Sequence, residues 1–231
     1  MVLTIDPTKM LFSRQQVAAA TGLAEDILAY WIKEDLLPAR GGGEGRGRPR
    51  QFGYEAIHRA AVYGELRHYG VGIMGMRELG AIIDEAVQLK EQLAGYGSDD
   101  VLDAQTIFHA RNFYGSATAD QIAQSGYGYP DFETWLAEWE GPPFSAKALE
   151  LSERYHPKMG RAWSIVDEIF GEQVFRCGSA LRWLITLDDD GNLELWPEAA
   201  HNDGAPSFPA ASYITLNIGL ILRRLWDLPC P

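Results

Sequence analysis

The stretch that most constrains this chain is residues 11–37, where a glycine turn separates two short amphipathic helices. Ser13 is placed to cap the first helix, and Thr21-Gly22-Leu23 ends it. The second helix begins near Ala24 and carries apolar residues at three- and four-residue spacing: Ile27, Leu28, Trp31 and Ile32. This arrangement is typical of a helix-turn-helix, whose second helix enters the major groove of DNA.

A basic, glycine-rich segment follows these helices. Pro38 ends the second helix, because proline lacks an amide donor and disfavours helix just before it. Residues 40–50 then hold five glycines, one glutamate and four arginines. A guanidinium matches the geometry of phosphate and guanine, so the segment predicts DNA contact, with a solvated loop as the alternative. The predicted DNA-binding residues here are Arg40, Arg46, Arg48 and Arg50.

The same region resembles the MerR family of winged helix-turn-helix regulators over roughly residues 10–95. The matching residues are Thr21-Gly22-Leu23, Leu28, Tyr30-Trp31, Leu36-Leu37-Pro38, Arg50, Phe52, Ile57, Leu66-Arg67, Gly70-Val71, Met76 and Leu79. The resemblance implies a DNA-binding transcription regulator that acts as a homodimer on an inverted-repeat operator. It also implies that the protein bends or untwists a promoter.

Several residues depart from the pattern of that family. Ala29 stands where the family usually has an arginine that touches phosphate, Ala24 replaces a Ser or Thr cap, and Asp35 replaces a glycine. Glu25 and Asp26 place negative charge at the start of the second helix, where it repels DNA phosphate. These departures motivate a second hypothesis, a protein-interaction adaptor whose winged helix binds DNA weakly or not at all.

Other residues of the two helices are further candidates for DNA contact. Arg14, Gln15 and Gln16 open the first helix, where backbone amides and side chains can hold a phosphate. Tyr30 and Lys33 lie on the polar side of the second helix, within reach of phosphates or bases. The alternative for each is an ordinary exposed side chain.

The charge is distributed unevenly along the chain. The 231 residues carry a net charge of −12, which argues against DNA binding if the chain is taken whole. Residues 1–70, however, hold nine Lys and Arg against eight Asp and Glu, whereas the remainder holds eleven against twenty-four. This asymmetry indicates separate roles for the two parts.

Composition indicates a soluble globular protein, with 46% hydrophobic and 23% charged residues. No apolar run is long enough to cross a bilayer, and the first residues lack the pattern of a secretory signal, so no membrane association is expected. Cys177 and Cys230 are the only cysteines, which favours a reduced, cytoplasmic location. Scattered histidines and acidic residues form no recognisable catalytic or metal site, so we expect neither an enzyme nor a cofactor.

The expected fold is mostly α with a small β component. It comprises a winged helix-turn-helix over residues 1–72, a linking or dimerisation helix over 73–96, and a C-terminal α+β effector or interaction domain over 97–231. A helix from Ser145 to about Phe170 is expected to bend near His156-Pro157. Residues 181–187 and 192–196 form a predicted hairpin, followed by a short strand at 212–215 and a closing helix at 216–226.

The linking helix carries an apolar stripe that needs a partner surface. In the resembled family this helix pairs antiparallel with its copy, and the alternative is packing on its own C-terminal domain. The predicted dimerisation residues are Leu79, Ile82, Ile83, Ala86, Leu89 and Leu93.

Six of the seven tryptophans lie in the C-terminal part. Aromatic clusters of this kind line small-molecule pockets or protein-interaction surfaces, and more commonly they form core. An effector, either a small molecule or a protein, is therefore expected there without an identity.

Overall fold

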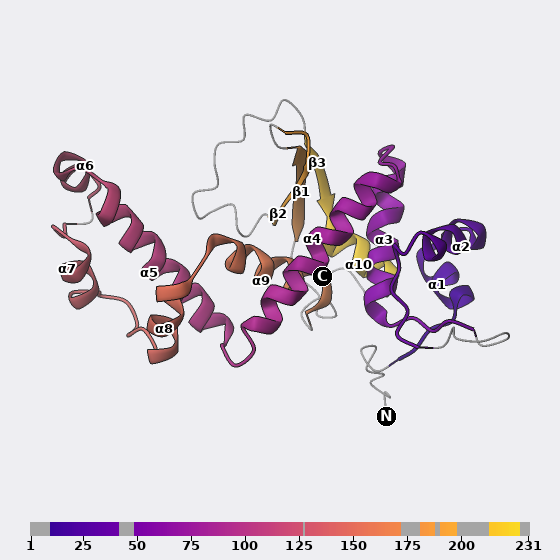
Figure 1. The fold of residues 1–231 in the computed structure, drawn as a ribbon, viewed down its shortest axis with the longest axis horizontal. Helices are drawn as coiled ribbons and strands as arrows, with labels where there is room; N and C mark the ends of the chain where they lie inside the picture. The colour runs from indigo at the N-terminus through magenta and orange to yellow at the C-terminus, as the bar shows by residue number, and fades with distance from the viewer. Residues whose placement is uncertain are drawn as a thin grey trace. The chain divides into compact units, whose positions relative to one another are not determined.

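The computed structural model describes residues 10–41, 49–126, 128–171, 181–187, 190–197 and 213–226. Helices predominate among these residues, and three strands lie near the C-terminal end (Figure 1). The predicted fold class, mostly α with a small β component, is confirmed. Arg46, Arg48, Cys177 and Cys230 lie outside the described residues.

The described part of the chain contains the following elements. The helices are α1 (Arg14–Thr21), α2 (Glu25–Lys33), α3 (Tyr54–His68), α4 (Ile73–Gln92), α5 (Ser98–Ser116), α6 (Ala119–Gln124), α7 (Phe132–Ala137), α8 (Ala146–Arg154), α9 (Pro157–Phe170) and α10 (Ile218–Leu225). The strands are β1 (Arg182–Leu187), β2 (Leu193–Pro197) and β3 (Ile214–Asn217).

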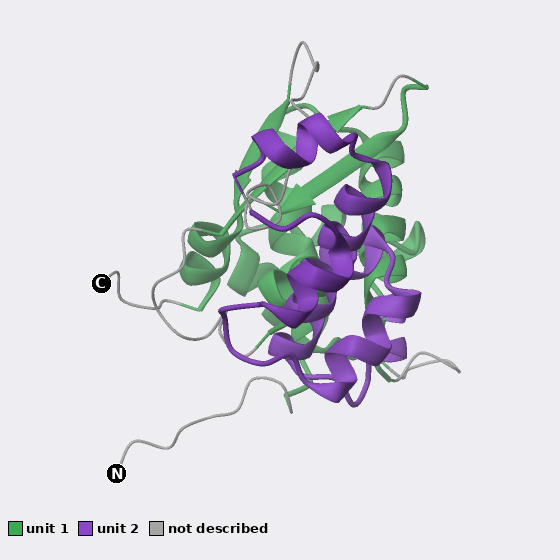
Figure 2. Cartoon of the chain, turned by 90° about the vertical axis from the view of Figure 1, so that its left-hand side faces the viewer, with its two compact units in different colours: residues 1–87, 163–231 green, residues 88–162 purple. Residues whose placement is uncertain are grey.

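The chain divides into two compact units (Figure 2). Unit 1 combines Met1–Val87 with Trp163–Pro231, and unit 2 is Gln88–Ala162. This division differs from the sequence-based one, which grouped residues 97–231 as one domain. The reason is packing, because α10 lies against α3 of the N-terminal part.

The helix-turn-helix forms as its sequence predicts. Ser13 caps α1 through a capping box, in which its hydroxyl accepts from the Gln16 amide and the Gln16 side chain accepts from the Ser13 amide. Gly22 ends α1 in the left-handed region, at φ 68°. Ala24 precedes α2 without a side-chain cap bond, as expected from the missing Ser or Thr.

The turn after α2 places a non-glycine residue in a left-handed conformation. Asp35 has φ 57°, the conformation that glycine adopts most readily. The Leu36 amide then donates to the Trp31 carbonyl at 2.9 Å, which closes the end of α2. The aspartate therefore keeps the turn geometry of a glycine, at a cost of roughly 1 kcal/mol.

The base of the wing is held by two short backbone bridges, Phe12 with Phe52 and Gly41 with Gln51. The Phe12 amide donates to the Phe52 carbonyl at 2.8 Å, and the Phe52 amide returns a bond of 2.9 Å. Both phenylalanine side chains are buried. The chain entering α1 is thus joined to the chain leaving the wing.

Helix α3 is the centre of unit 1, because α1 and α10 both pack against it. Ten of its fifteen residues are buried, far more than a helix with one solvated face would bury. Among them, His58 is fully buried, with its Nδ1 2.6 Å from the carbonyl of Ile169. Trp226, just after α10, donates its indole N–H to Nε2 of His58 at 2.8 Å.

The strands form an antiparallel sheet of order β2-β1-β3, with β1 in the centre. Trp183 pairs with Pro197 on one side and with Leu216 on the other. Alternate residues of the strands, such as Trp183, Ile185 and Leu195, are buried. The predicted hairpin and third strand are confirmed. Asp188 and Asp189, in the turn of the hairpin, lie outside the described residues.

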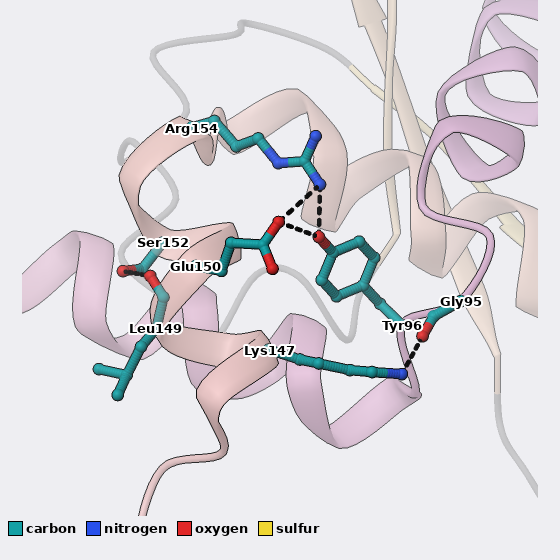
Figure 3. Close-up of polar contacts among 7 residues, drawn as sticks. All are labelled: Gly95, Tyr96, Lys147, Leu149, Glu150, Ser152 and Arg154. Atoms are coloured by element: carbon teal, nitrogen blue, oxygen red, sulfur yellow. Dashed lines mark hydrogen bonds and ion pairs between the residues drawn. The ribbon is translucent and has the colours of Figure 1, made fainter.

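Unit 2 is helical, with α5 packed against α8 and α7. Tyr96 lies between the two partners of an ion pair: its hydroxyl donates to Glu150 at 3.0 Å and accepts from Arg154 (Figure 3). Lys147 donates to the carbonyl of Gly95 (Figure 3). These bonds fix the segment before α5 onto α8.

The single bent helix expected from Ser145 to about Phe170 is instead two helices, α8 and α9, and the interruption lies where the bend was predicted because Pro157 begins the second helix. Helix α6 was not predicted. Its signal was the capping box of Thr118 and Gln121, which the structure contains.

We expect the stability of unit 1 to decrease as the pH falls from about 6.5 to 4. Burial lowers the pKa of His58 to about 4, so the unfolded chain binds a proton in this range that the folded chain excludes. The full difference is worth about 3 kcal/mol at the acid end. His58→Gln should remove this part of the pH dependence in denaturant unfolding curves. His68→Gln, at an exposed histidine, is the control. If the free energy of unfolding changed equally with pH in the wild type and both variants, His58 would not be the group responsible.

Candidate nucleic-acid interface

A surface hollow lies where α1 begins, beside the base of the wing. Its volume is about 490 Å³, and it is lined by Ser13, Arg14, Gln15, Ile32, Pro49, Arg50 and Phe52. Three of the predicted DNA-contact residues, Arg14, Gln15 and Arg50, therefore meet at one place. Residues separated by about 35 positions in the sequence are brought together by the Phe12–Phe52 bridge.

The electrostatics of this hollow suit an anion. The first turn of α1 contains no acidic residue, so its free amides and the positive end of the helix dipole are unopposed within the helix. Arg50 donates to the carbonyl of Ile32 at 3.3 Å, and Arg14, Ile32 and Arg50 all line the hollow. The hollow therefore brings two arginines and a helix amino end together, groups of the kind that bind anions.

Gln16 has a structural role at the same helix end. Its side-chain oxygen accepts from the Ser13 amide at 2.8 Å within the capping box. The prediction that Gln16 contacts DNA is not tested by this bond, but the oxygen is already engaged.

The outer face of α2 presents the other predicted contacts. Leu28 and Trp31 are buried, whereas Lys33 is exposed and Tyr30 has 47% of its surface accessible. A second hollow of about 370 Å³ adjoins this face, lined by Asp26, Ile27, Tyr30, Trp31, Arg67, Val71, Gly72, Ile73 and Met76. Arg67 lines this hollow but was not among the predicted DNA contacts. The Leu66-Arg67 match to the resembled family was the one feature of the sequence that could have suggested it.

Several arginines of the surface are paired with carboxylates. Arg14 lies 3.3 Å from Glu25, and Arg40 donates to Glu55. Arg77 pairs with Glu34. Exposed ion pairs of this kind contribute little and are screened by salt, so phosphate can replace the carboxylate. They nevertheless reduce the positive potential of this surface.

A protein-family model matches this part of the chain. Residues 12–80 match the family described as MerR HTH family regulatory protein. These residues form a MerR-type helix-turn-helix segment. The match contains α1, α2, the base of the wing and α3, and it ends within α4. A search of curated proteins found no match to the chain.

The predicted dimerisation stripe is largely covered within a single chain. Leu79, Ile83, Ala86 and Leu93 are buried, whereas Ile82 and Leu89 are half-buried. This burial favours the alternative in which α4 packs within its own chain. Gly80 illustrates the tight fit, because a Cβ there would lie 2.8 Å from the Tyr63 hydroxyl of α3.

The aromatic cluster of unit 2 packs upon itself. The ring of Trp139 stacks on Phe144 with centroids 5.1 Å apart, and Trp135 lies 5.2 Å from Trp139. Trp135 is only 6% exposed, which agrees with a core role. Effector binding by this part of the chain stays a prediction. Within the described residues, no helix is both long enough and apolar enough to span a bilayer.

We expect Arg50→Ala to weaken DNA binding about tenfold, or roughly 1.4 kcal/mol, by removing one phosphate contact. The slope of log affinity against log salt should flatten by about one unit. The melting temperature should barely change, because the side chain is exposed. Fluorescence anisotropy with labelled duplexes measures both quantities. Arg154→Ala, in unit 2, is the control, and an unchanged salt slope in Arg50→Ala would exclude the phosphate contact.

Proposed function

We propose that this protein is a sequence-specific, DNA-binding transcription regulator of MerR type. The observation that carries the proposal is the hollow at the start of α1, where Arg14, Gln15 and Arg50 converge within the family-matched segment. The amino end of α1 and the wing hold the phosphate backbone, and α2 enters the major groove. The family match also favours a regulatory role over an enzymatic one.

Base recognition would come from the outer face of α2. Tyr30 and Lys33 project from it, and both are exposed. Ala29 offers only a methyl group, which suits contact with a thymine methyl rather than a hydrogen bond. The operator is therefore expected to be recognised by few direct base contacts and to depend on DNA shape as well.

We further propose that the protein acts as a homodimer on an inverted repeat. A single helix-turn-helix contacts one half-site, and two copies related by a twofold axis meet two half-sites. Ile82 and Leu89 of α4 retain partial exposure and are the residues of the predicted stripe that a second copy can still reach. Arg46 and Arg48 of the wing belong to the same proposal as phosphate contacts.

The second candidate function is a protein-interaction adaptor. The observation in its favour is the ion pair of Arg14 with Glu25, which places an acidic group of α2 against a cation of the proposed phosphate site. Asp26 lies beside it. An adaptor would bind a protein partner while remaining inert toward DNA.

A binding assay with a pool of random duplexes separates the two candidates. A regulator selects one sequence class, and its affinity falls steeply as salt rises. An adaptor selects none. Affinity that is insensitive to both sequence and salt would refute the first proposal.

Glu25→Gln should strengthen DNA binding about threefold, because it removes a negative charge near the phosphates and releases Arg14 from its ion pair. The salt dependence should become steeper at the same time. Glu55→Gln is the matched change, because it removes the carboxylate partner of Arg40. A regulator requires an increase for Glu25→Gln, whereas an adaptor predicts no measurable DNA binding before or after the substitution.

Two substitutions in α4 separate a dimer surface from core. Ile83→Glu places a charge at a fully buried position and should lower the free energy of unfolding by roughly 3 kcal/mol or more. Ile82→Glu, at a half-buried position, should leave the protein folded but monomeric with reduced operator affinity. Light scattering and circular dichroism measure the two effects. A monomeric wild type, or a dimer that survives Ile82→Glu, would place the interface elsewhere or exclude it.

A further inference from the structure

Trp226 directly follows α10 and contacts the N-terminal part of the chain at Phe12 and at His58 of α3. Its ring is 6.1 Å from the ring of Phe12, at an interplanar angle of 58°. Its indole N–H donates to His58 of α3 at 2.8 Å. A residue near the end of the chain is thus fixed to the domain at the start of the chain.

The bond to His58 defines one protonation state. An indole N–H can only donate, so Nε2 of His58 must carry its lone pair, which leaves the proton on Nδ1 to donate to Ile169. A neutral imidazole meets both requirements, and burial keeps the pKa of His58 low, at about 4. The orientation of the Trp226 ring is therefore set from both sides of His58.

The contact with Phe12 leads directly to the wing. Phe12 exchanges two backbone hydrogen bonds with Phe52, at 2.8 and 2.9 Å. Gln51, next along the chain, accepts from the amide of Arg40 and donates to the carbonyl of Gly41. The two ends of the wing are consequently joined beside the Phe12–Phe52 bridge, and the Trp226 ring contacts Phe12 of that bridge.

The same contact also leads to the start of α1. Phe12 directly precedes Ser13, which caps that helix, and Arg50 directly precedes Gln51. A displacement of Phe12 would therefore move the helix amino end and Arg50, both of which line the proposed phosphate site.

We propose that Trp226 is a positioning residue of the DNA-binding surface, which it holds through Phe12 and the base of the wing. The inference rests on the proposed function for its consequence, DNA affinity, but not for the contact itself. It makes the C-terminal helix α10 the part of the chain through which a change elsewhere in unit 1 can reach the wing. Release of Trp226 weakens DNA binding without altering any residue that touches DNA.

The first test is amide hydrogen exchange, and it needs no DNA. Trp226→Ala should reduce the protection of the Phe12 and Phe52 amides, which form the bridge, more than that of the β1 amides of Ile185 and its neighbours. A general loss of stability would reduce both sets alike. Leu220→Ala removes an apolar side chain from the exposed side of α10 and should leave the bridge protected. Unchanged protection at Phe12 and Phe52, or an equal loss in β1, would overturn the proposal.

The second test is operator affinity. Trp226→Ala should weaken binding about tenfold and flatten the salt slope by about one unit, as expected for one displaced phosphate contact. Trp226→Phe keeps a ring against Phe12 but loses the bond to His58, so it should retain part of the affinity.

Trp183→Phe is the matched control, because Trp183 is a buried tryptophan of the same unit whose indole N–H donates to Glu168 instead. It should lower stability while leaving the salt slope unchanged. Equal losses of affinity in Trp183→Phe and Trp226→Ala, or wild-type affinity in Trp226→Ala, would overturn the positioning role. A wild-type protein that binds no DNA would count against the proposed function alone, since the exchange measurement decides the contact independently.

Discussion

The structure of unit 1 depends on the burial of α3. A helix with ten of fifteen residues buried has no solvated face of ordinary width, so it requires cover from more than one direction. Helix α1 supplies one cover and α10 supplies another. The buried imidazole of His58 adds a second requirement, because it needs a hydrogen-bond acceptor at one ring nitrogen and a donor at the other. Ile169 and Trp226 meet that need, and both come from the C-terminal segment.

This requirement links the two ends of the chain to the candidate interface. The side of unit 1 that carries the hollow at α1 is formed by the N-terminal residues alone. Its support, however, includes Trp226 on Phe12. The candidate DNA-binding surface is thus supported in part by the C-terminal segment, and the proposed positioning role of Trp226 follows from that support. Surface charge opposes phosphate binding, since Glu25 and Glu55 form ion pairs with Arg14 and Arg40.

Local features of the sequence predicted local structure well. The cap at Ser13, the turn at Gly22 and the break at Pro157 each rest on the chemistry of one or two neighbouring residues, and all are present. Arg14 and Arg50 were each predicted as DNA contacts, but their meeting in one hollow comes from the Phe12–Phe52 bridge and was not predicted. Asp35 shows the same principle in another form, since a short polar residue there adopts the left-handed conformation that glycine favours.

Contacts distant in the sequence were not predictable from it. The apolar pattern of α10 shows that the helix has a face to bury, but it does not say against which partner. His58 has no sequence context that distinguishes a core histidine from a surface one, because its partners lie more than one hundred residues away. The ion pair of Arg14 with Glu25 likewise depends on the angle between two helices. The stripe of α4 was predicted correctly as apolar, but periodicity alone does not separate a dimer seam from the core of one chain.

The division of unit 1 between residues up to 87 and residues from 163 also bears on how the protein is made. A ribosome delivers the chain from its N-terminal end, so α1, α2 and α3 emerge well before the helix that completes their cover. Until residue 226 has been synthesised, the α10 side of α3, including His58, stays without its native partner. The newly made helix-turn-helix therefore lacks its full support through most of translation. A nascent chain that stops short of α10 would present that apolar surface to chaperones and proteases rather than bind DNA.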